Sequence, residues 1–258
     1  MKNILVIGGH DPSGGAGIQA DIEAIAANGC HAVTIISALT VQDTTNVLQM
    51  IPVQASILRR QLDVLLADME VSAIKLGLIG NAENARLIAE RLRRMPQLPV
   101  IVDPVLAAGG GSELATDALM QFYRRELLPL TTVFTPNLPE AQRISGRRDV
   151  DSCAHALLDM GARNILITGG HEQGQAITNR LYDASGKVSE WQWPSIAGEF
   201  HGSGCTLASA IAAFTVQQLP MKLALRLAQA YTCDTLENAQ KLSKGQLIPL
   251  RVSCGSAA

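Results

Sequence analysis

The sequence predicts an α/β fold in which helices cover both faces of a central, mostly parallel sheet. Hydrophobic residues make up 47% of the 258 positions and aromatic residues only 3%, so the core must be built mainly from Ala, Val, Ile and Leu. That composition suits buried parallel strands. Short β-branched runs also alternate with longer amphipathic stretches, and this alternation is typical of right-handed βαβ units.

Each predicted strand is a short run rich in β-branched and aliphatic residues. These runs are Asn3–Ile7, Ala32–Ser37, Ala73–Leu76, Val100–Asp103, Thr132–Phe134 and Asn164–Thr168. Apolar residues at helical spacing lie between several of the runs. They predict helices over Gln54–Ala67, Ala82–Met95 and Thr116–Glu126.

The last third of the chain departs from this alternation. Ala176–Tyr182 and Val188–Trp193, joined around Asp183–Lys187, predict an antiparallel hairpin. Two closing helices are predicted at about Ser203–Val216 and Met221–Gln240. No linker rich in Pro, Gly or Ser and no repeat divides the chain, so we expect one domain over residues 1–258.

Composition gives no indication of a nucleic-acid or membrane partner. The formal net charge is −2, without a long basic or acidic block. No signal peptide is evident, and no stretch approaches the roughly 20 apolar residues of a membrane span. The five cysteines are scattered and form no C-x-x-C pair, which favours a reducing cytoplasm over a disulfide framework or a structural zinc site.

Polar and glycine-rich segments follow the predicted strands where ligands bind in open α/β sheets, beyond the carboxyl ends. These segments are Gly8–Gly17, Ala38–Thr45, Asp103-Pro104, Thr135–Asn137 and Thr168–His171. His10, His171 and His201 lie in predicted loops at the same edge, and the favoured interpretation of each is a partly buried, hydrogen-bonded side chain. A lid is predicted over Ala107–Ser112, where three successive glycines allow wide backbone motion, with a disordered surface loop as the alternative.

The most informative motif is Gly202–Leu207, in which two glycines precede a predicted helix. A helix N-terminus carries unpaired N–H donors and partial positive charge, so a glycine turn that opens one is suited to bind an anion. We expect the same field to favour the thiolate of Cys205. A turn that merely starts a helix is the alternative interpretation.

Two carboxylate positions each have a functional and a structural interpretation. The segment Gly8–Gly17 has neither the glycine spacing of a dinucleotide-binding motif nor the lysine of a P-loop. Asp11 is therefore expected either to accept a hydrogen bond from a ligand hydroxyl or, with Ser13, to cap a helix that begins at Gly14. Glu140, three residues after Asn137, is either a capping residue or, with Asp103, part of a magnesium site.

Taken together, these motifs resemble the ribokinase-type kinases, and within them the hydroxymethylpyrimidine and phosphomethylpyrimidine kinases of thiamine biosynthesis. The resemblance covers nearly the whole chain in order. It rests on His10–Asp21, Ala38–Thr44, Val102–Val105, Thr135–Ala141, Gly169–His171 and Gly202–Leu207. It implies a ribokinase-like three-layer sandwich, with the cysteine of the last motif pointing to the pyrimidine branch.

The resemblance also implies ATP-dependent phosphorylation of 4-amino-5-hydroxymethyl-2-methylpyrimidine, and of its monophosphate, with magnesium. Cys205 would accept the hydroxymethyl proton, while the N–H groups of Gly202, Ser203, Gly204 and Cys205 would hold the transferred phosphoryl group. The implied substrate-binding residues are Gly9, Asp11, Gln42 and Val105, and the Gln42 amide would hydrogen-bond to the aminopyrimidine edge. The implied nucleotide-binding residues are Asn137, Thr168 and Gly170, and the implied magnesium residues are Asp103 and Glu140. Relatives often associate as dimers, which implies a possible homodimer.

Three departures from the family pattern bear on substrate choice. Thr168 stands where many relatives have lysine, which leaves open how well a phosphorylated second substrate is handled. Ser203 replaces a common threonine and keeps its hydroxyl, and His10 stands where serine is frequent. A pyridoxal or pyridoxine kinase of vitamin B6 salvage is the alternative enzyme, and a non-catalytic sensor of a thiamine precursor is the alternative of another class. Gln42 favours the pyrimidine.

Overall fold

The computed structural model describes residues 1–106, 116–169 and 176–252. Within these residues, one nine-stranded sheet runs in the spatial order β3-β2-β1-β4-β5-β6-β7-β8-β9. The strands are β1 (Asn3–His10), β2 (His31–Gln42), β3 (Val47–Pro52), β4 (Ala73–Leu76), β5 (Val100–Val102), β6 (Val133–Phe134), β7 (Asn164–Ile167), β8 (Ala176–Asp183) and β9 (Gly186–Pro194). The helices are α1 (Gly17–Ala27), α2 (Ala55–Asp68), α3 (Ala82–Arg93), α4 (Asp117–Phe122), α5 (Leu138–Ser145), α6 (Val150–Asp159), α7 (Ser203–Thr215) and α8 (Met221–Glu237).

The centre of the sheet is parallel and both edges are antiparallel. Strands β2, β1, β4, β5, β6 and β7 run in one direction, so their carboxyl ends lie along one edge. Strand β3 pairs antiparallel with β2, and β8 and β9 form an antiparallel hairpin against β7. The predicted mostly parallel sheet and the predicted hairpin are therefore confirmed.

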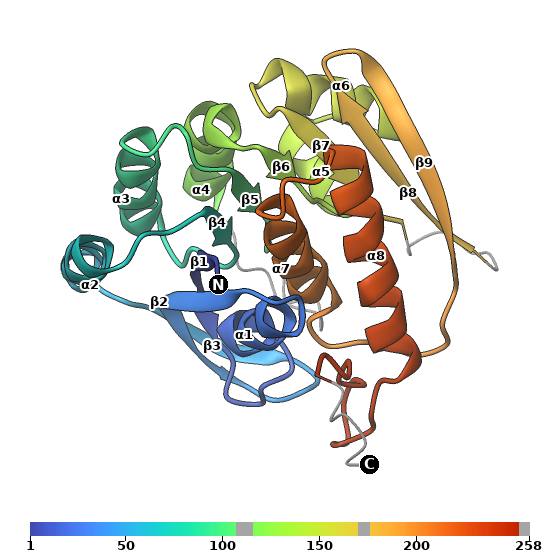
Figure 1. The fold of residues 1–258 in the computed structure, drawn as a ribbon, viewed down its shortest axis with the longest axis horizontal. Coiled ribbons are helices and arrows are strands. Elements are labelled where there is room, and N and C mark those ends of the chain that lie inside the picture. Colours follow the sequence, from blue (N-terminus) through green and yellow to red (C-terminus); the bar gives the residue numbers. More distant parts are fainter. Residues whose placement is uncertain (107–115, 170–175, 253–258) are drawn as a thin grey trace.

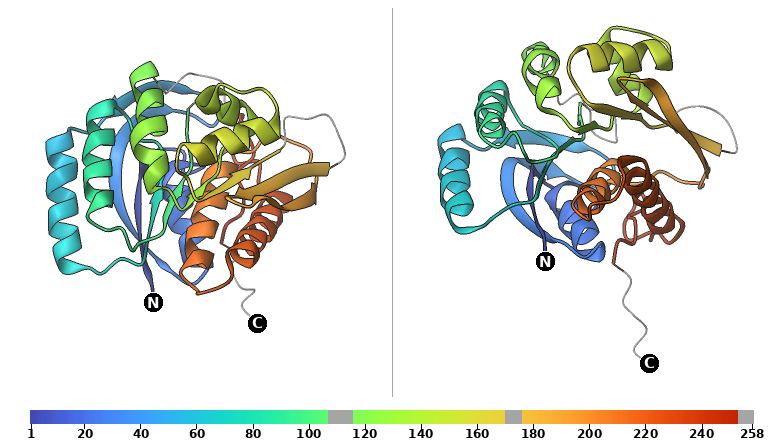
Figure 2. Two further views of the ribbon diagram at one scale, coloured as in Figure 1. Left: turned by 90° about the horizontal axis from the view of Figure 1, so that it is seen from above. Right: turned by 45° about the horizontal axis from the view of Figure 1, so that its top comes forward.

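Helices cover both faces of the sheet, as Figures 1 and 2 show. On β1, Leu5 and Ile7 pack into a core with α2 to α6, whereas Ile4 and Val6 pack into a second core with α1, α7 and α8. Successive strand residues point to opposite faces, so a continuous apolar run can fill two cores at once. The predicted three-layer arrangement is confirmed.

The boundaries of the first two strands were predicted too short. Gly8, Gly9 and His10 belong to β1, because pairing with β2 continues beyond a bulge between Gly8 and Gly9. Residues 38–42 belong to β2 rather than to a loop, because they pair with β3. Strand β3 was not predicted, because this edge strand has no buried residue and hence no clear alternation of apolar and polar positions.

The other predicted strands and helices are present with small boundary shifts. The predicted helix at 116–126 is α4 followed by a π-helical turn at Tyr123–Leu127. Helix α6 was not predicted, and the predicted lid at 107–112 lies outside the described residues. In the part of the chain that the structure describes, no helix has the length and apolar character needed to span a membrane.

Candidate functional site

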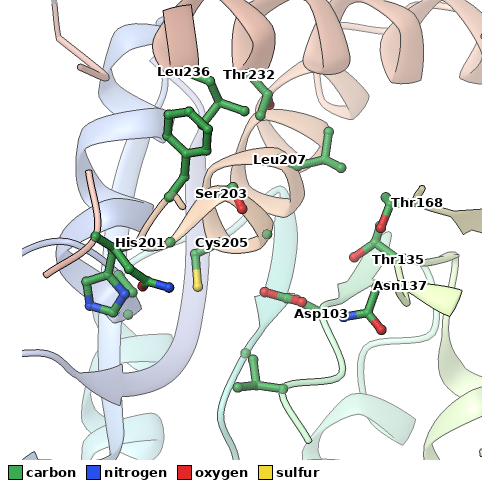
Figure 3. Close-up of a pocket in the computed structure, with 18 of the residues that line it drawn as sticks. Asp103, Thr135, Asn137, Thr168, His201, Ser203, Cys205, Leu207, Thr232 and Leu236 are labelled. Atoms are coloured by element: carbon green, nitrogen blue, oxygen red, sulfur yellow. The ribbon is translucent and has the colours of Figure 1, made fainter. Parts of the chain in front are cut away.

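A cavity of about 550 Å³ opens at the carboxyl edge of the parallel strands, against the start of α7. Every predicted site residue in the described part of the chain lines it: Gly9, Asp11, Gln42, Asp103, Val105, Asn137, Glu140, Thr168, Gly202, Ser203, Gly204 and Cys205. Gly170 lies outside the described residues. In Figure 3, the Asp103 carboxylate lies between Cys205 on one side and Asn137 and Thr168 on the other.

The turn before α7 is built from close backbone contact. Gly202 has a φ of 80°, and a Cβ there would lie 2.2 Å from the Gly15 carbonyl oxygen, so only glycine fits. At the start of α7, the Thr206 N–H donates to the Gly202 carbonyl at 2.9 Å. The preceding N–H groups have no partner within the helix and belong to cavity-lining residues. This is the geometry of an anion site.

Cys205 lies in the first turn of α7, with its sulfur toward the cavity (Figure 3). Burial raises the pKa of its thiol to about 12; Lys75 opposes this effect, and the charges of Asp103 and Asp21 add to it. The expectation of a thiolate in the free protein was therefore wrong. Burial of the thiol outweighs the favourable charge of Lys75.

The Asp11 carboxylate is occupied by protein donors. It accepts the N–H groups of Ser13 and Ala16, each at 2.8 Å, and Nε2 of His201 lies 2.8 Å from Oδ2. Burial by itself raises the pKa of Asp11, but the hydrogen bonds from His201 and Ser13 hold it well below its ordinary value. The expected capping of a helix from Gly14 is not borne out, because α1 begins at Gly17 and has no side-chain capping bond at its N-cap residue, Ala16; Asp11 orders the preceding loop instead. The expectation that His201 is hydrogen-bonded is confirmed.

The remaining substrate-binding candidates lie around this carboxylate. The Gln42 amide is at the end of β2, with Nε2 3.5 Å from Nε2 of His201. Gly9 allows β1 to approach the segment after β4, since a Cβ there would lie 2.8 Å from Cδ2 of Leu78. Val105 follows Asp103, whose carbonyl accepts the Val105 N–H at 2.9 Å. A side-chain amide is thus positioned at the cavity with two rigid backbone segments beside it.

Asp103 and Glu140 place a buried and a partly buried carboxyl group at the cavity. Burial raises the pKa of Asp103, and burial together with the Asp103 charge raises the pKa of Glu140 to about 8. Glu140 and Asn137 form a capping box: Oε2 accepts the Asn137 N–H at 3.0 Å, and Asn137 Oδ1 accepts the Glu140 N–H at 2.9 Å. The capping interpretation of Glu140 is therefore confirmed.

The two carboxyl groups also suit magnesium. Among the described residues, no group of three or more His, Cys, Asp and Glu side chains could hold a metal ion by itself. Magnesium keeps several waters and binds through one or two carboxylates together with substrate phosphates. Burial raises the pKa of both groups and the Asp103 charge adds to the rise at Glu140, so a nearby cation would stabilise their charged forms.

Asn137 and Thr168 are neighbours across the ends of β6 and β7. They form an isolated parallel bridge, in which the Thr168 N–H donates to the Pro136 carbonyl at 3.0 Å. The next residue, Gly169, donates to Oδ1 of Asn179 at 2.9 Å, and a Cβ on Gly169 would lie 2.6 Å from the Thr178 carbonyl oxygen. These contacts bring the two described nucleotide-binding candidates into one wall of the cavity.

A buried ion pair that was not predicted from the sequence also lines the cavity. Lys75 Nζ lies 2.7 Å from Oδ1 of Asp21, and these side chains are 1% and 0% exposed. Burial lowers the pKa of Lys75, but the charges of Asp21 and Asp103 outweigh burial, so the pKa is raised. The available signal was a single charged residue inside the apolar strand at 73–76, since buried lysines are rare unless paired.

The comparisons with known proteins agree with this geometry. The family model described as phosphomethylpyrimidine kinase matches residues 11–249. A hydroxymethylpyrimidine/phosphomethylpyrimidine kinase of Rhizobium meliloti (strain 1021) is 36% identical over 94% of this chain and 93% of that protein. The protein of the same name in Aquifex aeolicus (strain VF5) is 32% identical over 93% and 96%. A crystal structure of an ADP complex of Bacillus subtilis pyridoxal kinase has a TM-score of 0.88 at 29% identity, covering 96% of this chain and 97% of that chain. The chain therefore belongs to the phosphomethylpyrimidine kinase family.

Proposed function

We propose that this protein transfers the γ-phosphoryl group of ATP to the hydroxymethyl group of 4-amino-5-hydroxymethyl-2-methylpyrimidine, and then phosphorylates the monophosphate. The observation that carries the proposal is the glycine turn at 202–205, which opens α7 in the same cavity as Gln42 and Asp103. ATP use is supported by the family and by the ADP complex of the pyridoxal kinase. The names of the relatives support the substrate.

The substrate ring is held at the end of β2. A pyrimidine with a ring nitrogen beside an exocyclic amine offers one acceptor and one donor, and the Gln42 amide offers the complementary pair. The hydroxymethyl group then points toward Cys205 and the start of α7. The N–H groups of residues 202–205 stabilise charge on the transferred group, and in phosphoryl transfer this stabilisation and positioning supply most of the rate.

Cys205 accepts the hydroxymethyl proton in this proposal. Because the pKa of its thiol is about 12 in the free protein, the thiolate is scarce at neutral pH. Asp103 is one of the groups that raise this pKa, so a cation held by Asp103 favours the thiolate. The proton acceptor is therefore expected to be most effective when the nucleotide and magnesium are bound.

Asp103 and Glu140 are the proposed magnesium residues, through the water shell of the ion or directly. When bound, magnesium would neutralise charge on the ATP phosphates. Asn137 and Thr168 border the phosphate chain from the ends of β6 and β7. Thr168 stands where many relatives have lysine, so we propose that the backbone N–H groups of the glycine turn bind the phosphate of the second, already phosphorylated substrate.

Other features of the protein remain proposals. We propose one kinase domain over residues 1–258, a homodimer and a cytoplasmic location. The location is supported by the cysteines of the described residues, Cys30, Cys153, Cys205 and Cys233, which are all free thiols. No nucleic acid or membrane is among the proposed partners.

A pyridoxal kinase is the second candidate function. It is favoured by the similarity to the Bacillus subtilis structure, which has a TM-score of 0.88. Gln42 lines the cavity and favours the pyrimidine, because pyridoxal lacks the aminopyrimidine edge that an amide recognises. The two candidates share the reaction and differ in the ring.

A competition assay tests the proposed function. The protein is incubated with ATP, magnesium and equal amounts of hydroxymethylpyrimidine and pyridoxal, and the products are identified by mass spectrometry. We expect pyrimidine monophosphate followed by diphosphate. Monophosphate alone would contradict the second phosphorylation, predominant pyridoxal phosphate would contradict the substrate, and no product would favour a sensor.

Gln42→Ala is expected to separate the two substrates. Loss of the amide removes hydrogen bonds to the pyrimidine edge, so kcat/KM for hydroxymethylpyrimidine should fall by about 10- to 100-fold. The value for pyridoxal should change by less than about threefold. Gln49→Ala is the matched control, because Gln49 is an exposed glutamine on the neighbouring strand β3. Equal losses with both substrates would refute the reading role of Gln42.

Cys205→Ala tests the proton acceptor through its pH dependence. A thiol with a raised pKa is protonated at neutral pH and loses its proton as the pH rises, so wild-type kcat/KM should increase by nearly tenfold per unit from pH 7 to 9. Cys205→Ala should lower kcat by about 100-fold and flatten this increase. Cys153→Ala, which removes a core thiol outside the cavity, should keep the wild-type profile. An unchanged rate and profile in Cys205→Ala would assign the reaction to positioning and the anion site alone.

A further inference from the structure

A buried arginine, Arg251, contacts the glycine turn from the side away from the cavity. Arg251 follows α8 in the C-terminal segment, and its side chain is 0% exposed. It does not line the cavity, and it lies just beyond residue 249, where the family match ends. Burying a guanidinium costs desolvation free energy unless its N–H donors are paired, so the groups that pair with Arg251 indicate its role.

The guanidinium joins three segments that form one wall of the cavity. Nη2 donates to the carbonyls of Gly15 and His201, the latter at 3.3 Å, and Nε donates to Oγ1 of Thr206 at 2.8 Å. Thr206 in turn donates to the Gly202 carbonyl at 2.8 Å. One planar group therefore fixes the loop at 14–17, the turn at 201–202 and the first turn of α7 relative to one another.

The Arg251 guanidinium leaves no space for a side chain at Gly202. A Cβ on Gly202 would lie 2.9 Å from Nη2 of Arg251, in addition to its clash with the Gly15 carbonyl. The guanidinium thus packs directly against the backbone whose N–H groups belong to the anion site. Its own backbone is anchored as well, since Tyr231 donates its hydroxyl proton to the Arg251 carbonyl at 2.8 Å.

The positive charge of Arg251 lies at the N-terminus of α7, where a cation is ordinarily unfavourable. Cations stabilise helix C-termini, whereas the N-terminus already carries partial positive charge. The nearby carboxylate of Glu23, 3.1 Å from Nη1, is on a side chain that is 47% exposed, so its screening is partial. A buried cation behind a helix N-terminus raises the positive potential there, which is useful to an anion and not to the helix.

We propose that Arg251 is a positioning residue for phosphoryl transfer. Its guanidinium fixes the two glycine turns at the distance that the anion site requires and adds positive potential behind the N–H groups of residues 202–205. Lysine cannot replace it, because one ammonium group lacks the planar set of donors that reaches two carbonyls and a hydroxyl together. The proposal rests on the proposed kinase reaction but not on the identity of the ring that is phosphorylated.

The test compares Arg251→Lys and Arg251→Ala with Glu23→Gln. The Glu23 variant removes the ion pair at the exposed side and leaves the turn contacts intact, so it should stay within about twofold of wild-type kcat. Both Arg251 variants should lose about 100-fold in kcat, while KM for the phosphoryl acceptor changes by less than about threefold. Added guanidinium at millimolar concentration should restore about tenfold of the loss in Arg251→Ala.

Folding is followed in parallel by circular dichroism and urea unfolding. Wild-type kcat in Arg251→Lys would overturn the proposal. A loss that follows the folded fraction in both variants, without rescue by guanidinium, would also overturn it, because Arg251 would then serve stability alone. Wild-type protein is assayed with hydroxymethylpyrimidine and with pyridoxal. If only pyridoxal is phosphorylated, the proposed substrate fails while the Arg251 comparison still stands; if neither is phosphorylated, the proposed function itself fails.

Discussion

The turn at residues 14–17 and the turn at residues 201–204 pack so closely that a side chain on Gly15 or Gly202 would overlap the opposite turn. A Cβ on Gly202 would lie 2.2 Å from the Gly15 carbonyl oxygen, and a Cβ on Gly15 would lie 2.2 Å from Cδ2 of His201. This contact fixes where α7 begins relative to the end of β1. The positions of the N–H groups, of Cys205 and of the Asp11–His201 pair all follow from it.

The electrostatics of the cavity follow from burying several charges together. Lys75 is paired with Asp21 at 2.7 Å; burial raises the pKa of Cys205 and of Glu140, and the Asp103 charge adds to both shifts. A buried ion pair is a poor source of stability, because desolvation offsets most of the attraction. In the proposed kinase reaction, the fixed ammonium and the carboxyl groups would prepare the site for a polyphosphate that carries magnesium.

The fold could be predicted because each central strand has a dense apolar run, as Ala73–Leu76 shows, whereas edge strand β3 gave no pattern to detect. The site could be located because glycines and polar residues follow the strands at one edge. The partners of these residues could not be predicted, since Arg251 contacts Gly15 across 236 positions of the chain. The protonation of Cys205 depends on burial, which the local motif does not reveal.

The central claim is that the N–H groups at the start of α7 bind the phosphoryl group during transfer. It is tested most directly by amide hydrogen exchange of Ser203, Gly204 and Cys205, measured by NMR in the free protein and with ADP, magnesium and aluminium fluoride. These amides have no helical acceptor in the free protein, so we expect exchange to slow by about tenfold or more when the analogue binds. Unchanged exchange at these three positions, with calorimetry showing that the nucleotide complex has formed, would contradict the account.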